Sequence, residues 1–154
     1  MPQLRINEDL WKQADSVRKH EWRVLIADLS RDATLWPSRR GQTLIMGADD
    51  KAIRLTFIDE AGERTLLDVQ RSELSRELSE YLAVMDRLGE DGLSSMRAEA
   101  LDMAKRVVHD AAARRLGALL PEMGQGLETA RRFFTLVVSI VVDTTGKRTG
   151  HLVR

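Results

Sequence analysis

The chain has 154 residues, and its basic and acidic side chains are equal in number, so the formal net charge is zero. This length suits one domain, and the absence of cysteine excludes disulfides, thiolate nucleophiles and cysteine-ligated metals. Proteins that bind nucleic acid by neutralising phosphates usually carry a basic excess, which this chain lacks. Because the first ten residues do not resemble a signal peptide, we expect a cytoplasmic protein.

The N-terminal third predicts a short strand and a helix. The strand would cover residues 4–6, and the helix would begin at a cap, Asp15 or Ser16. Four apolar residues then share the i, i+3, i+4, i+7 spacing of one helix face: Trp22, Leu25, Ile26 and Leu29. The helix should therefore end near Leu29, before Trp36-Pro37, because a residue that precedes proline avoids the helical conformation.

The next segment predicts an antiparallel meander. Residues 43–46 are apolar, residues 53–57 alternate between apolar and polar, and residues 64–69 place Thr65, Leu67 and Val69 on one face. Polar turn sequences separate the three runs. We expect a small sheet with one face covered by helices.

Three helices should complete the domain, which we expect to span residues 1–142. The first covers about 72–88 and stops at Gly89 in the left-handed conformation, the second runs from Ser94 or Ser95 to Leu120, and the third covers 128–142. The apolar run within the third is too short to span a membrane, so a buried helix is expected, with a buried strand as the alternative. The fold class is therefore α+β, with a polar basic tail, 143–154, that we expect to be flexible.

The second of these helices contains the stretch EALDMAKRVVHD, residues 99–110. Its apolar residues predict a buried face formed by Ala100, Met103, Ala104, Val107, Val108 and Ala111. Asp102, Arg106 and His109 lie almost opposite, at i, i+4 and i+7. They form either a solvated face with an ion pair or a site in which Asp102 orients His109, a group that titrates near neutrality.

Other chemical signatures are missing from the sequence. It contains no H-E-x-x-H, no phosphate-binding loop and no G-x-S-x-G. One histidine and one carboxylate seven residues apart do not make a metal site, so neither a metal nor a cofactor is expected.

Several stretches together resemble a bacterial family of small proteins, uncharacterised protein family 0262. They are HEWRV through Asp28-Leu29, a hairpin with DEAGE at 59–63, EALDM with Arg106 and His109, and TARRFFTL at 129–136. The resemblance implies that Asp102-Met103, Arg106 and His109 match one signature of the family and Arg131-Arg132 another. Relatives tend to continue after the histidine with an Asn-Glu-Gly type of sequence, where this chain has Asp110-Ala111-Ala112.

Three functions remain compatible with these observations. The first is a non-enzymatic interaction or regulatory protein that self-associates or docks to a protein partner. The second is an enzyme or a small-anion binder, in which Arg106, Arg131 and Arg132 hold an oxyanion and His109 acts as an acid or base oriented by Asp102. The third is association with RNA or the ribosome through the basic tail, which the neutral charge disfavours.

Overall fold

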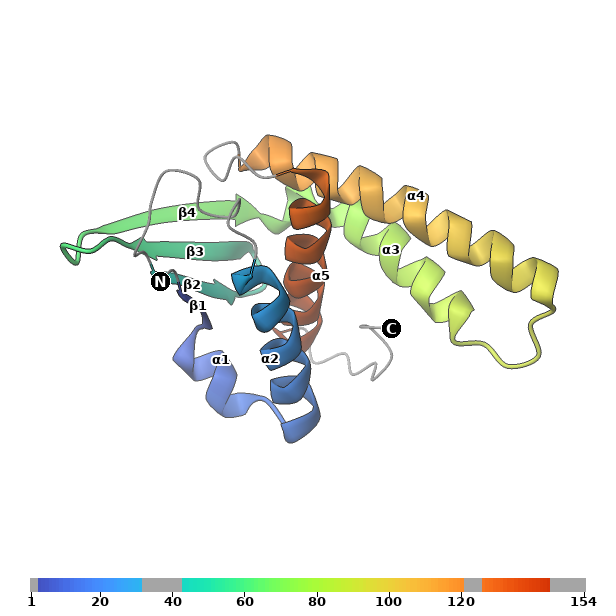
Figure 1. Cartoon of the computed structure of the whole chain (residues 1–154), viewed down its shortest axis with the longest axis horizontal. Helices are drawn as coiled ribbons and strands as arrows, with labels where there is room; N and C mark the ends of the chain where they lie inside the picture. Colours follow the sequence, from blue (N-terminus) through green and yellow to red (C-terminus); the bar gives the residue numbers. More distant parts are fainter. Residues whose placement is uncertain (1–2, 32–42, 121–125, 145–154) are drawn as a thin grey trace.

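A computed structural model describes residues 3–31, 43–120 and 126–144 of the chain (Figure 1). One strand and two helices come first, three consecutive strands follow, and the remaining helices complete the chain. The elements are β1 (Gln3–Ile6), α1 (Glu8–Gln13), α2 (Ser16–Ser30), β2 (Thr43–Ala48), β3 (Ala52–Ile58), β4 (Arg64–Gln70), η2 (Arg71–Glu73), α3 (Ser75–Leu88), α4 (Ser95–Leu119) and α5 (Leu127–Thr144). The α+β class predicted from the sequence is confirmed.

The four-stranded sheet has the order β1-β2-β3-β4. β2, β3 and β4 form the expected antiparallel meander, with Leu44 opposite Phe57 and Ile53 opposite Val69. β1 adds to the edge parallel to β2, a pairing that the sequence did not predict. Parallel neighbours need a crossover connection, and helices α1 and α2 lie within it.

One face of the sheet is buried beneath helices. α2 packs against β1 and α5, and α5 packs against β2 and α4 (Figure 1). The apolar run 133–142 lies in α5, so the expectation of a buried helix rather than a strand is confirmed. In this run Phe133, Phe134, Leu136 and Val137 are fully buried, which explains why the helix tolerates many β-branched residues: packing outweighs propensity.

Two local features differ from the sequence-based expectations. Helix α1 was not predicted; it begins at the cap Asn7, whose side chain accepts hydrogen bonds from the backbone N–H groups of Asp9 and Leu10. The prediction of a left-handed Gly89 was wrong, because its φ is −82° and the helix ends with ordinary right-handed geometry. Gly62, at the β3–β4 turn, does have a positive φ of 84°. Trp36-Pro37 and the tail from 145 onward lie outside the described residues.

Candidate functional site

Helix α4 carries most of the predicted site residues and forms a long hairpin with α3. It begins at Ser94, whose hydroxyl accepts a hydrogen bond from the N–H of Arg97. The hairpin projects away from the sheet and from α2, while α5 packs against α4 (Figure 1). Which face of α4 turns inward therefore decides which of its residues can form a site.

The face that packs differs from the predicted one. The buried residues of α4 are Leu101, Ala112, Ala113 and Leu116. Ala100 and Ala111 are exposed, and Met103 and Val107 are 66% and 68% exposed, so that part of the prediction was wrong. The reason is that apolar residues occur on several sides of this alanine-rich helix. Its periodicity over residues 99–110 alone cannot identify the packed side.

The rotation of α4 divides the predicted trio. Asp102 and Arg106 remain on the surface and form an i,i+4 ion pair of 3.4 Å, with their side chains 56% and 77% exposed. An exposed pair of this kind contributes about 0.3–0.5 kcal/mol at most. His109 instead turns toward α3 and α5 and is partly buried. Asp102 therefore pairs with Arg106 and does not orient the His109 ring, which is hydrogen-bonded to α5 instead.

His109 lies in a cluster with residues of α3 and α5. Its ring centroid is 5.2 Å from that of Tyr81 and 5.9 Å from that of Phe134. Its Nε2 is 3.0 Å from the carbonyl oxygen of Arg131 and 3.1 Å from Oγ1 of Thr135. Because a carbonyl oxygen can only accept, this geometry assigns the proton of the neutral ring to Nε2. Thr135 also donates to the same carbonyl at 3.0 Å.

The surroundings of His109 favour its neutral form. Burial lowers the pKa of His109, and the positive charges of Lys105 and Arg131 act in the same direction. The hydrogen bond to the Arg131 carbonyl and the charge of Asp110 oppose this lowering of the pKa. A neutral ring that donates Nε2–H to a backbone carbonyl ties α4 to α5, whatever further role it has.

The predicted arginines of α5 are both paired. Arg131 Nε lies 2.6 Å from Oδ1 of Asp110, an ion pair in which the N–H direction is outside hydrogen-bond geometry. Arg132 donates to Glu128 at 3.0 Å. Of the predicted residues, His109 and Arg131 are thus brought together, whereas Asp102 and Arg106 lie in the N-terminal half of α4 and remain exposed. Asp110 supplies the counter-charge of Arg131.

A second polar cluster, between α2 and α5, was not predicted. Ser139 Oγ accepts hydrogen bonds from Trp22 Nε1 at 3.0 Å and from Arg18 at 3.2 Å. Arg18 also pairs with Glu21 at 2.8 Å. Burial raises the pKa of Glu21, opposed by the Arg18 charge and by hydrogen bonds from Arg18 and Ser139. In the sequence this cluster is indicated only by Ser139, a single serine within the apolar residues 136–142 of α5.

An apolar row follows the outer side of α4. We name it the α4 stripe and define it as Met96, Ala100, Met103 and Val107. The three large members are 81%, 66% and 68% exposed. The other large exposed apolar residues in the described part of the chain do not form such a row. Leu66 lies on β4, and the polar residue His20 separates Val17 from Val24 on α2. Aligned exposed apolar residues, unlike scattered ones, mark interaction surfaces.

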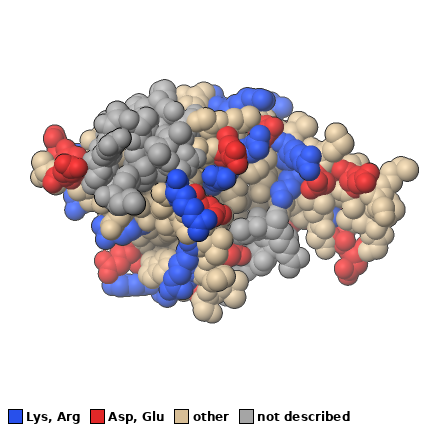
Figure 2. Space-filling model, in the orientation of Figure 1, with Lys and Arg blue, Asp and Glu red and all other residues tan. Residues whose placement is uncertain are grey.

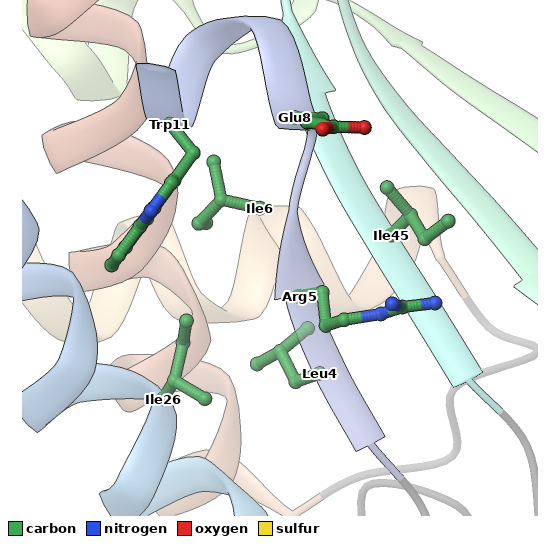
Figure 3. Close-up of a pocket in the computed structure, with 7 residues that line it drawn as sticks. All are labelled: Leu4, Arg5, Ile6, Glu8, Trp11, Ile26 and Ile45. Atoms are coloured by element: carbon green, nitrogen blue, oxygen red, sulfur yellow. The ribbon is translucent and has the colours of Figure 1, made fainter. Parts of the chain in front are cut away.

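A pocket of about 470 Å³ lies along β1 (Figure 3). Leu4, Ile6, Trp11 and Ile26 face it from one side of the strand, whereas Arg5 and Ile45 lie on the other side. Apolar side chains predominate, and the charged lining residues, Arg5 and Glu8, are exposed. No histidine is among the described residues that line this pocket.

Two classes of site find no support in the described ranges. No group of three or more potential metal ligands occurs among the described residues. Figure 2 shows basic and acidic side chains intermixed on the visible face rather than a continuous basic patch. No helix in the described part of the chain is long and apolar enough to cross a bilayer.

Comparison with known proteins assigns the chain to a family. Residues 1–143 match the family model described as Uncharacterised protein family (UPF0262). The match covers almost the whole chain, so the protein belongs to this family, as the resemblance implied. No curated protein and no solved structure matches the chain.

Proposed function

We propose that this protein is a non-enzymatic interaction protein of the bacterial cytoplasm that docks to a protein surface through the α4 stripe. The observation that carries the proposal is the alignment of the exposed residues Met96, Met103 and Val107 along α4. This helix belongs to a hairpin that projects from the rest of the molecule (Figure 1). Leaving such side chains in water costs free energy that a docked surface would recover, about 1.5–3 kcal/mol for each side chain fully buried. The surface docked is either a second copy or a different protein.

The proposal predicts that polar substitutions in the stripe abolish association while leaving the fold intact. The test variant is Met103→Glu with Val107→Glu, and the matched control is Leu66→Glu, whose parent residue is 71% exposed on β4. Self-association is measured by sedimentation, and binding to other proteins by comparing what the two variants and the wild type capture. Association that is lost in the α4 variant alone supports the proposal. Association that survives in the α4 variant contradicts it.

A second candidate is a small-anion binder that uses His109 and Arg131. It is favoured by the positive charge of Arg131, which lies near enough to His109 to lower the pKa of the ring. It is opposed by Asp110, which already neutralises the Arg131 guanidinium. Titration with inorganic phosphate, followed through the NMR signals of the His109 ring, tests it: movement that saturates and is lost in Arg131→Gln favours this candidate, and unchanged signals reject it.

A further inference from the structure

We infer that the occupant of the α4 stripe is a second copy of this chain, with the two α4 helices antiparallel about a twofold axis. This inference rests on the proposed function and names its partner. The members of the stripe follow one another at intervals of four, three and four residues. This is the spacing with which two helices interlock side chains along a common seam. The stripe lies opposite the buried residues Leu101 and Ala112, so docking there leaves the existing core undisturbed.

The sizes of the stripe residues match in the antiparallel register. With Met103 placed over Ala100 of the second copy, Met96 falls over Val107, and the twofold axis repeats both contacts. Each large side chain then meets a smaller one, as close packing of a helix seam requires. A parallel pair would place Ala100 on Ala100 and Met103 on Met103, which alternates gaps with crowded layers.

The charges beside the stripe select the same register. Glu99 and Arg106 flank the stripe on one side, and both are exposed. In the antiparallel pair each Glu99 lies opposite Arg106 of the other copy, which produces two equivalent ion pairs. In a parallel pair their neighbours across the seam would be Ala104 and Ala111, and no attraction would result.

The residues needed for these ion pairs can form them. Glu99 has no ion-pair partner among the described residues. Arg106 contacts Asp102 through NH2 at 3.4 Å, in an exposed pair. A guanidinium has five N–H donors, so Arg106 can hold Asp102 and the incoming carboxylate together. On the other side of the seam Arg97 would face Ala104, so no like charges meet. The free end of the hairpin projects from the body of the molecule (Figure 1).

Charge exchange tests the inference. Glu99→Arg and Arg106→Glu each place like charges opposite one another in a homodimer, so each should raise the dimer Kd by about tenfold or more. An equimolar mixture of the two variants restores both ion pairs and should dimerise like the wild type, as should the double variant. Sedimentation measures the oligomeric state of each sample, and circular dichroism verifies that each variant is folded. If the equimolar mixture does not dimerise, the antiparallel register is wrong.

Cysteine cross-linking gives an independent measure, because the chain contains no cysteine of its own. Met96→Cys alone should not cross-link, since an antiparallel pair holds the two copies of this position about 16 Å apart along the axis at 1.5 Å per residue. A mixture of Met96→Cys with Val107→Cys should form the heterodimer disulfide. Cross-linking of Met96→Cys to itself would indicate a parallel pair and would overturn the inference.

The outcomes also separate this inference from the proposed function. A wild-type protein that is monomeric at about 100 μM, where a dimer with a Kd of about 10 μM would be largely formed, overturns the second copy as partner. If that monomer still binds another protein and loses it in the α4 variant, the proposed function stands. If neither kind of association depends on the stripe, both fail.

Discussion

Replacement of Ser139 by alanine should destabilise the protein through the buried cluster between α2 and α5. Ser139 is 1% exposed, and its hydroxyl accepts hydrogen bonds from Trp22 and Arg18 and bonds to the Glu21 carboxylate. Without the oxygen, the Trp22 Nε1–H lacks its acceptor, while Arg18 keeps Glu21. A buried donor left unsatisfied costs about 1–3 kcal/mol. Adding the weakened Arg18 and Glu21 contacts, we expect a loss of about 2–4 kcal/mol in the free energy of unfolding.

Urea and thermal denaturation measure this loss. At about 2–4 °C per kcal/mol for a chain of this size, the thermal midpoint should fall by about 5–15 °C. The matched control is Ser75→Ala, since the Ser75 hydroxyl donates to the Ser72 carbonyl on an exposed surface, and this variant should lose less than about 0.5 kcal/mol.

A double-mutant cycle with Trp22→Phe then isolates the indole–hydroxyl contact, because the effects of two partners in one hydrogen bond are not additive. A Ser139→Ala variant as stable as the control, or strict additivity in the cycle, would refute the argument that this cluster joins α2 to α5.

Three further predictions concern α4. Burial lowers the pKa of His109, so the unfolded state binds the proton more readily than the folded state. The unfolding free energy should therefore fall as the pH drops below about 6.5 toward the pKa of the folded state. Thermal midpoints measured from pH 5 to 8 should depend less steeply on pH in His109→Gln, and an unchanged slope would contradict the lowered pKa of His109. In urea titrations at protein concentrations low enough to keep the chain monomeric, alanine at Asp102 or Arg106 should change the unfolding free energy by less than about 0.5 kcal/mol, and a larger loss would mean that the pair is not solvated. Under the same conditions Leu116→Ala should cost about 2–5 kcal/mol, whereas Val107→Ala should cost under about 0.5 kcal/mol; reversed values would mean that the predicted face of α4 is the packed one.

The sheet and the apolar helix could be predicted from local patterns. β3 alternates apolar and polar residues so regularly that Ile53, Leu55 and Phe57 had to share one face, and they are buried together. In α5 almost every side is apolar, so no choice of orientation remained. The parallel addition of β1 could not be predicted, because strand pairing depends on how the α1–α2 connection folds back rather than on residues 3–6.

The candidate site was predictable in its residues and not in its arrangement. The motif pointed to His109 and Arg131, which the fold does bring together, but it grouped them with Asp102 and Arg106, which remain on the surface. The error arose from the rotation of one helix. Apolar residues lie on several sides of α4, and packing against α3 and α5 decides which side is covered, with His109 in contact with Tyr81 and Phe134.

By itself the sequence determined the α+β class, the meander and the buried α5, because these follow from periodicities repeated within a few residues. Its motifs resembled those of the family to which the chain belongs. The tertiary structure alone decided that Ser139 joins α2 to α5, that Asp110 neutralises Arg131, and that Met103 and Val107 face solvent. Each of these depends on contacts between helices far apart in the chain. Local periodicity gives the faces of a helix, and only its neighbours determine which face is covered.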